Sequence, residues 1–141
     1  MKAVNAAPVL VPLDIPDFKL LPKTVAKALN DLEHCTLEVM ASDAEKNPVS
    51  SFEITVIHNK KARPTIFIPH GGPHTAYSSQ FIMPISFLAA VGYNVVTINY
   101  RGSTGFGEDF LQSLPGKIGD ADVRDCISAV ESAKKAGKIC S

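Results

Sequence analysis

The sequence predicts an α/β fold, a sheet that contains parallel strands and has helices packed on it. Two short apolar runs, at residues 65–68 and 94–98, are each followed by a glycine-rich loop and then by a helical pattern. Two earlier segments, at 36–40 and 52–57, alternate between apolar and polar residues, as half-buried strands do. Two strands followed by strand–helix–strand–helix favour an α/β sheet with right-handed crossovers.

Composition limits the classes of function. Hydrophobic residues make up 45% of the 141 residues and charged residues 20%, which is typical of one globular domain or of part of a larger one. Fourteen Lys and Arg balance fourteen Asp and Glu, so the basic excess of a nucleic-acid-binding or membrane-binding protein is absent. No apolar run approaches the roughly 20 residues of a membrane-spanning helix. Three widely spaced cysteines, Cys35, Cys126 and Cys140, indicate reduced thiols and a cytoplasmic protein.

Residues 1–35 are expected to form a linker or an extended arm, and the folded domain is placed at residues 36–141. Four prolines in the first 22 residues interrupt any regular element, because proline cannot continue a helix and biases its predecessor toward extended backbone. Residues 23–33 carry a weak helical pattern. Turn-forming residues at 43–48 separate the two alternating strands.

The apolar runs at 65–68 and 94–98 are expected to be central strands covered on both faces. Between them, residues 80–91 are predicted to be helical. Pro84 would lie in the first turn of this helix, where proline is tolerated, and Gly92 would end it.

A short helix is expected at 108–114 and the clearest helix of the chain at 120–136. Asp120 or Asp122 can cap the start of the longer helix, and lysines and a glycine mark its end. The apolar stripe of this helix consists of Val123, Ile127 and Val130.

The strongest chemical signal is PHGGPH at residues 69–74, directly after a buried strand. Two consecutive glycines let the backbone turn sharply and present its N–H groups with no Cβ in the way. N–H groups fixed at the carboxyl end of a sheet can stabilise the oxyanion that forms when a carbonyl is attacked, as the HGGG-type loop of α/β-hydrolases does. A tight turn that only connects strand to helix is the alternative.

No metal and no other cofactor is predicted. The spacing of His70 and His74 suits zinc only on a helix, and the glycines and proline between them disfavour a helix there. No third ligand stands at a matching spacing. His34 and His58 are interpreted as surface or packing residues.

A second glycine-rich loop, NYRGSTGFGE at residues 99–108, does not match GxGxxG, and no GxxxxGK[ST] occurs in the sequence, so nucleotide binding is not predicted. Ser103 lacks the small residue two places before it that a nucleophile elbow needs, and is interpreted as a loop hydroxyl. The guanidinium of Arg101 is expected to pair with a buried carboxylate and fix the loop, with a substrate carboxylate as the alternative partner.

No nucleophile is visible in the sequence. GxSxG does not occur. Cys126 lies on the apolar side of its predicted helix and is interpreted as a packing residue, and Cys140 lies in the terminal stub. The residues alone therefore indicate part of an oxyanion hole without an attacking group.

Taken together, PHGGPH at 69–74, NYRGSTGFG at 99–107 and SLPGKIG at 113–119 resemble the acylaminoacyl-peptidase branch of the prolyl oligopeptidase family of serine peptidases. The resemblance runs from about residue 52 to about residue 137. It implies a β-propeller followed by an α/β-hydrolase domain, of which residues 36–141 would be the truncated N-terminal part. It also implies an activity, the removal of an N-acylated amino acid from the blocked N-terminus of a peptide substrate.

The resemblance implies roles for four residues. Gly72 would offer a backbone N–H to the oxyanion, Gly71 would shape the turn, and His70 and His74 would lie at the active-site mouth. The family's serine, aspartate and histidine would all follow residue 141, so no triad role is assigned and the chain is expected to be inactive alone.

Two other hypotheses stay open. In one, the chain is a non-catalytic interaction module that pairs with an intact hydrolase, or with itself, through the open edge of the 65–68 strand. The family's nucleophile strand would normally cover that edge, so a marginally stable or aggregating product is expected. In the other, the chain is a small stand-alone hydrolase that uses Ser103 or a cysteine.

Overall fold

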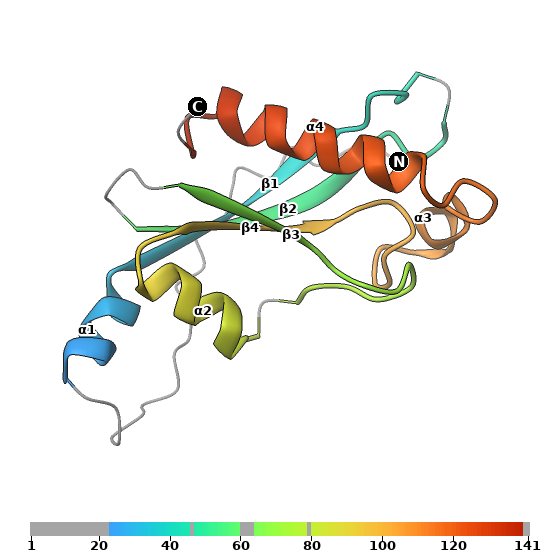
Figure 1. Cartoon of the computed structure of the whole chain (residues 1–141). Helices are drawn as coiled ribbons and strands as arrows, with labels where there is room; N and C mark the ends of the chain where they lie inside the picture. The colour runs from blue at the N-terminus through green and yellow to red at the C-terminus, as the bar shows by residue number, and fades with distance from the viewer. Residues whose placement is uncertain (1–22, 46, 60–63, 79, 140–141) are drawn as a thin grey trace.

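A computed structural model describes residues 23–45, 47–59, 64–78 and 80–139 and shows one mixed sheet with helices on both faces (Figure 1). The predicted fold class is thereby confirmed. The elements in chain order are α1 (Lys23–Asn30), β1 (Leu32–Met40), β2 (Ser51–Asn59), β3 (Thr65–Pro69), α2 (Met83–Ala90), β4 (Asn94–Asn99), α3 (Glu108–Gln112) and α4 (Ala121–Lys135).

The four strands lie in the order β1-β2-β4-β3. Strand β2 pairs antiparallel with both β1 and β4, whereas β3 and β4 pair parallel. All six residues of β4 are buried, as expected of a central strand. The expectation that residues 65–68 also form a central strand is wrong for this sheet, because β3 lies at its edge and is only half-buried. An apolar run indicates that both faces of a strand pack against other elements, but it does not indicate how many neighbouring strands pair with it.

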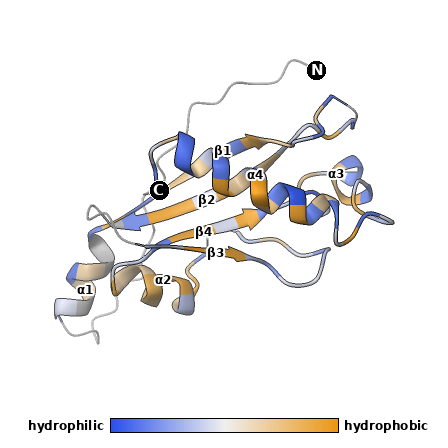
Figure 2. Cartoon of the chain, turned by 45° about the horizontal axis from the view of Figure 1, so that its top comes forward, coloured by the Kyte–Doolittle hydropathy of each residue, from blue (hydrophilic) through white to orange (hydrophobic). Residues whose placement is uncertain are grey.

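Helices α2 and α4 lie on opposite faces of the sheet (Figure 1). The larger core lies on the α4 side, where side chains such as Ile54, Val56 and Val96 pack with Ala129 and Ala133. A smaller core lies on the α2 side and consists of Ile57, Ile85, Ala89 and Val95. In Figure 2 the strands between these helices carry orange stretches interspersed with blue and white ones, and the orange residues supply the two cores.

Helix α4 agrees with its prediction to within one residue at each end, but the predicted apolar stripe is wrong. Val123 and Ile127 are 48% and 54% exposed. The buried face consists of Ala121, Asp125, Ser128, Ala129 and Ala133. Asp125 is buried on this face because the Arg101 guanidinium pairs with its carboxylate, and the other residues of the face have small side chains. Asp120 is at the N-cap without a capping side-chain bond, whereas Asp122 Oδ1 accepts a hydrogen bond from the N–H of Gly119 at 2.7 Å.

Helix α1 and the first residues of β1 lie inside the segment predicted as an arm. The weak helical pattern at 23–33 is therefore real, although the helix ends at Asn30 and the strand begins at Leu32. The expectation for residues 1–22 lies outside the described residues. The division of the chain at residue 36 stays a prediction.

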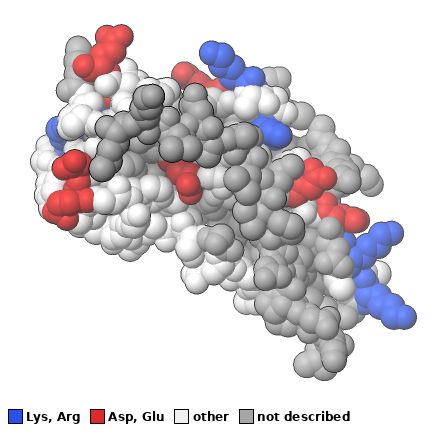
Figure 3. Space-filling view, turned by 180° about the vertical axis from the view of Figure 1, so that it is seen from behind, with Lys and Arg blue, Asp and Glu red and all other residues white. Residues whose placement is uncertain are grey.

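Charged side chains are dispersed over the face of the molecule opposite to the view of Figure 1. Seen from behind (Figure 3), the described residues show small separate groups of both signs, in keeping with the balanced composition. None of the described helices combines the length and the apolar character needed to cross a membrane.

Candidate functional site

Two loops lie side by side beyond the carboxyl ends of β3 and β4 (Figure 1). We call residues 70–78 the first loop and residues 100–107 the second loop. Because β3 and β4 are parallel neighbours, both loops leave the sheet at the carboxyl ends of the strands. Open α/β sheets bind their ligands at this end. The loops are joined directly, since the N–H of Thr104 donates to the carbonyl of Thr75 at 3.1 Å.

The first loop turns at Gly71 and Gly72, both of which are exposed. Gly72 has a φ of 69°, in the left-handed region that favours glycine. Thr75 braces the turn, because its Oγ1 lies 2.9 Å from the carbonyl oxygen of Gly71 and 3.3 Å from that of Gly72. Between the described residues, no hydrogen bond uses the N–H of either glycine. The turn is thus held through its carbonyl groups.

His70 is buried and bridges the two loops. Its Nε2 lies 2.7 Å from Ser103 Oγ and its Nδ1 lies 2.9 Å from Thr75 Oγ1. The ring stacks on Tyr100 with 4.3 Å between centroids, and the Tyr100 hydroxyl donates to the carbonyl of His70 at 3.0 Å. Burial lowers the pKa of His70, against an opposing effect of the Gly71 and Gly72 backbone. His70 therefore supports the turn from inside.

His74 is the exposed histidine of the first loop. Its Nδ1 lies 3.1 Å from the carbonyl oxygen of Gly102, so it adds another contact between the loops. Of the two histidines placed at the mouth by resemblance, His74 is the one that lies at the surface. No cluster of His, Cys, Asp or Glu side chains suited to a metal occurs among the described residues.

Arg101 holds the second loop against α4 and the β1–β2 turn. Its Nε donates to Asp125 Oδ2 at 2.9 Å, its Nη2 to Asp125 Oδ1 at 2.7 Å, and its Nη1 to Asp43 Oδ1 at 2.6 Å. The Arg101 N–H also donates to Asp125 Oδ2 at 3.0 Å. Burial acts to raise the pKa of Asp43, but the hydrogen bond and charge of Arg101 hold that pKa below its usual value. The guanidinium of Arg101 is thus paired with carboxylates of the protein itself, as the first of the two expected partners requires.

The hydroxyl and thiol groups near the loops are not arranged as nucleophiles. Ser103 is fully buried, and its Oγ donates to the carbonyl of Tyr100 at 2.6 Å. Burial, with Asp125 and Asp122 nearby, raises the pKa of Cys126 to about 11, and burial raises that of Cys35. Because the thiolate is the reactive form, neither thiol is activated.

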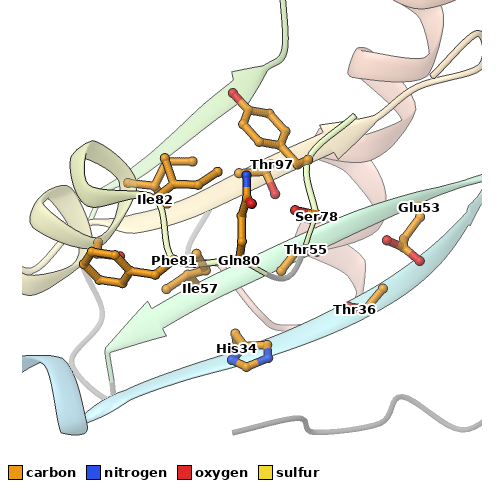
Figure 4. Close-up of a pocket in the computed structure, with 13 residues that line it drawn as sticks. His34, Thr36, Glu53, Thr55, Ile57, Ser78, Gln80, Phe81, Ile82 and Thr97 are labelled. Atoms are coloured by element: carbon orange, nitrogen blue, oxygen red, sulfur yellow. The ribbon is translucent and has the colours of Figure 1, made fainter. Parts of the chain in front are cut away.

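A pocket of about 250 Å³ adjoins the first loop on the α2 side of the sheet. Thr36, Thr55 and Thr97 lie in one cross-strand row on its floor, and residues 77–78 and 80–82 form part of its wall (Figure 4). Tyr77 joins the pocket to the loop, because it lines the pocket and packs edge-on against His70 at 5.8 Å. The alternating polar residues of β1 and β2 predicted a solvent-facing strand face, and nothing in that pattern indicates a pocket.

Glu53 in this pocket stands opposite Glu38 across β1 and β2. Burial raises the pKa of Glu53, against a hydrogen bond from Asn99. A carboxyl group with a raised folded-state pKa binds its proton more tightly when folded, so its ionisation lowers stability as pH rises. Since like charges directly opposite one another destabilise a sheet, we expect Glu53→Gln to raise the free energy of unfolding by about 0.2–1 kcal/mol at neutral pH.

Urea denaturation at neutral pH and below the ordinary glutamate pKa of about 4.3 tests this expectation. The gain should disappear in acid, where Glu53 is protonated in both states. The exposed Glu131→Gln on α4 serves as the control and should change little at either pH. An equal gain at both pH values would contradict the charge-based explanation.

The strand order β1-β2-β4-β3, with β3 and β4 parallel and a glycine turn directly after β3, defines an α/β-hydrolase type of domain. Residues 79–141 match the model of the prolyl oligopeptidase family. The chain belongs to this family of serine peptidases and matches the N-terminal part of its hydrolase domain.

Curated relatives from plants and from mammals carry the name acylamino-acid-releasing enzyme. The acylamino-acid-releasing enzyme of Arabidopsis thaliana is 40% identical over 123 residues, which are 80% of this chain and 16% of that protein. Acylamino-acid-releasing enzyme 1 of Oryza sativa subsp. japonica is 53% identical over 77 residues, or 55% of this chain and 10% of that protein. The chain therefore spans about a sixth or less of the length of these relatives.

Solved structures confirm the fold. An acylaminoacyl peptidase of Pyrococcus horikoshii superposes with a TM-score of 0.69 at 24% identity, over 82% of this chain and 19% of that one. The uncomplexed form of that peptidase gives a TM-score of 0.68 at 26% identity, over 79% of this chain and 18% of that one.

Proposed function

We propose that the chain supplies the oxyanion-binding part of a serine-type acylaminoacyl-peptidase, which hydrolyses N-acylated amino acids from blocked peptide N-termini. The exposed Gly71–Gly72 turn carries the proposal, because its N–H groups make no hydrogen bond between the described residues. The names of the curated relatives support the reaction and the class of substrate.

In this proposal the Gly72 N–H donates to the oxygen that becomes negative when the substrate carbonyl is attacked. Gly71 shapes the turn, His70 supports it from within, and the exposed His74 lies at the mouth of the site. The 141 residues contain no GxSxG, so the attacking serine, its base and the second oxyanion donor come from a segment outside them. The chain by itself is then inactive.

The test is a chimera in which residues 32–139 replace the matching segment of the Arabidopsis thaliana relative. We expect it to hydrolyse N-acetyl-alanine 4-nitroanilide and Gly72→Ala to lower kcat about tenfold with little change in KM. An alanine at a φ of 69° is strained by about 1–2 kcal/mol. Relief of that strain moves the N–H away from the oxyanion and weakens the hydrogen bond to the transition state. A loss of about 1.4 kcal/mol in transition-state stabilisation corresponds to a tenfold lower kcat.

Gly105→Ala is the matched control, because it has a φ of 91° and open space around it but lies outside the turn. It should leave kcat unchanged. A similar fall in kcat for both variants, or none for Gly72→Ala, would refute the role of Gly72. Stoichiometric labelling of the chain alone by a fluorophosphonate probe would refute its inactivity.

A second candidate function is that of an interaction module, and the edge position of β3 favours it. In the part of the chain that the structure describes, β3 pairs with β4 alone. Apolar side chains are also exposed on both flanking helices, Met83 and Phe87 on α2 and Val123 and Ile127 on α4. An open strand edge is a template for pairing with another chain, here an intact hydrolase or a second copy.

We expect the purified chain to sediment faster as its concentration rises, and Thr65→Lys to weaken this association. A lysine at the start of an edge strand opposes edge-to-edge pairing. Within the described part of the chain, the substitution removes one long side-chain hydrogen bond, from Asn94 Nδ2 to Thr65 Oγ1 at 3.5 Å. Thr104→Lys adds the same charge in the exposed part of the second loop and should associate as the unmodified chain does. Concentration-independent sedimentation of a monomer would contradict pairing between copies.

A further inference from the structure

The His70 imidazole lies between two hydroxyl groups, and each hydroxyl has a carbonyl oxygen as its second partner. Ser103 Oγ is 2.7 Å from His70 Nε2 and 2.6 Å from the carbonyl oxygen of Tyr100. Thr75 Oγ1 is 2.9 Å from His70 Nδ1 and 2.9 Å from the carbonyl oxygen of Gly71. We call Thr75, His70 and Ser103 the His70 bridge.

The number of hydrogens in the His70 bridge depends on the charge of the ring. A protonated imidazole donates from both nitrogens, so both hydroxyls remain free to donate to their carbonyls and all four contacts are made. A neutral imidazole has one nitrogen without hydrogen, which must accept from its hydroxyl neighbour. The hydroxyl that donates to the ring then gives up its carbonyl.

Burial decides which carbonyl is given up. Ser103 and Tyr100 are buried, so breaking their bond would leave a polar group without any partner. Thr75 and Gly71 are exposed, so the Gly71 carbonyl can bind water instead. The neutral ring therefore carries its hydrogen on Nε2, donates to Ser103 and accepts from Thr75.

We propose that Thr75 and Ser103 are positioning residues that act through His70 on the Gly71–Gly72 turn. When the His70 ring is protonated, the Thr75 hydroxyl donates to the Gly71 carbonyl and braces the turn; when the ring is neutral, this hydrogen bond is released. Uptake of one solvent proton at Nδ1 turns the Thr75 hydroxyl from the ring to the Gly71 carbonyl. The consequence for oxyanion binding rests on the proposed function, whereas the exchange of hydrogen bonds does not.

The groups around the ring favour its neutral form at neutral pH. Burial lowers the pKa of His70, and only the backbone of Gly71 and Gly72 is an opposing influence. The titratable side chains that face His70 or line the same hollow are Tyr100, Tyr77, Asp122 and Cys126, and His74 of the same loop contacts Gly102. The braced turn is thus the form present in acid, below the ordinary histidine pKa of about 6.5.

The test is a pH titration of the full chain labelled with ¹⁵N, read by magic-angle-spinning NMR, which does not require a monomeric sample. At neutral pH, His70 should carry its hydrogen on Nε2. As His70 becomes protonated, the amide signals of Gly71 and Gly72 should shift with the same midpoint. A hydrogen on Nδ1 at neutral pH, or glycine amides that do not follow His70, would overturn the proposal.

Two variants separate positioning from general support. Thr75→Val keeps the shape of Thr75 but lacks the hydroxyl, so His70 should still titrate while the shifts of the two glycine amides are lost; Thr75→Ser should restore them. Ser103→Ala removes the acceptor at Nε2 and should move the neutral hydrogen to Nδ1. The side-chain signals of His58 on β2 serve as the internal control, and at any one pH they should be the same in all variants.

Each result decides something on its own. Because Thr75 is exposed, its variants keep the test valid if Ser103→Ala does not fold. Glycine shifts that persist in Thr75→Val would refute the exchange. An inactive chimera together with the expected titration would refute the proposed function and leave the His70 bridge standing.

Discussion

Replacing Asp125 by alanine is expected to lower the free energy of unfolding by about 3–5 kcal/mol, the range found when one partner of a buried ion pair is removed. Asp125 is 0% exposed and Arg101 is 2% exposed. The Asp125 carboxylate accepts hydrogen bonds from the Arg101 N–H, Nε and Nη2. Without it, a buried guanidinium keeps only the contact with Asp43 and the backbone N–H loses its acceptor.

Urea denaturation at neutral pH, followed by circular dichroism, measures this loss. Arg124→Ala is the matched control, because Arg124 is the preceding residue of α4 and also forms an ion pair, with Asp120 at 2.8 Å. Its side chain is 42% exposed, so its removal should cost only about 0–1 kcal/mol. If both variants lost a similar amount of unfolding free energy, burial would not make the Arg101–Asp125 pair more important to stability than an exposed ion pair.

Gly102→Ala is the second large effect, with an expected loss of about 2–5 kcal/mol. Gly102 has a φ of 99°, which strains an L-residue by about 1–2 kcal/mol. A Cβ there would also lie 2.6 Å from the Cβ of Leu114. That atom is attached to the backbone and cannot rotate away, so overpacking adds about 1–3 kcal/mol.

Two other glycines separate the contributions. Gly105→Ala has the positive φ without the contact and should cost about 1–2 kcal/mol. Gly71→Ala has neither, because Gly71 is not among the positive-φ glycines and nothing lies within 4 Å of the added atom. Thermal unfolding of the three variants measures the series. A Gly102→Ala variant no less stable than Gly105→Ala would exclude the contact with Leu114.

Local pattern predicted most of the helices and strands, although β1 begins four residues before the expected strand, but it did not predict which strands are neighbours. The run at 94–98 indicated a buried strand, and β4 is fully buried. The edge position of β3 depends on β4 lying between it and β2, which no pattern within residues 65–68 encodes. The buried face of α4 was missed for a similar reason, since Asp125 is buried only because Arg101, 24 residues away, pairs with it.

The candidate site shows the same limit. The glycine pair at 71–72 was predicted as a turn after a strand because the signal is local. The contact of His70 with Ser103 spans 33 residues and that of Arg101 with Asp43 spans 58. Sequence reasoning expected Arg101 to meet a carboxylate, but the choice among fourteen Asp and Glu requires the fold.

The insertion of β4 between β2 and β3 also sets an order for chain synthesis. As the polypeptide leaves the ribosome, the β1–β2 hairpin and the β3 segment have no contact with each other in the sheet until β4 emerges. Until then, both have unpaired backbone N–H and C=O groups along an open edge, and pairings between segments distant in sequence form slowly. Nascent chains from which β4 has not yet emerged should therefore be the ones that chaperones bind.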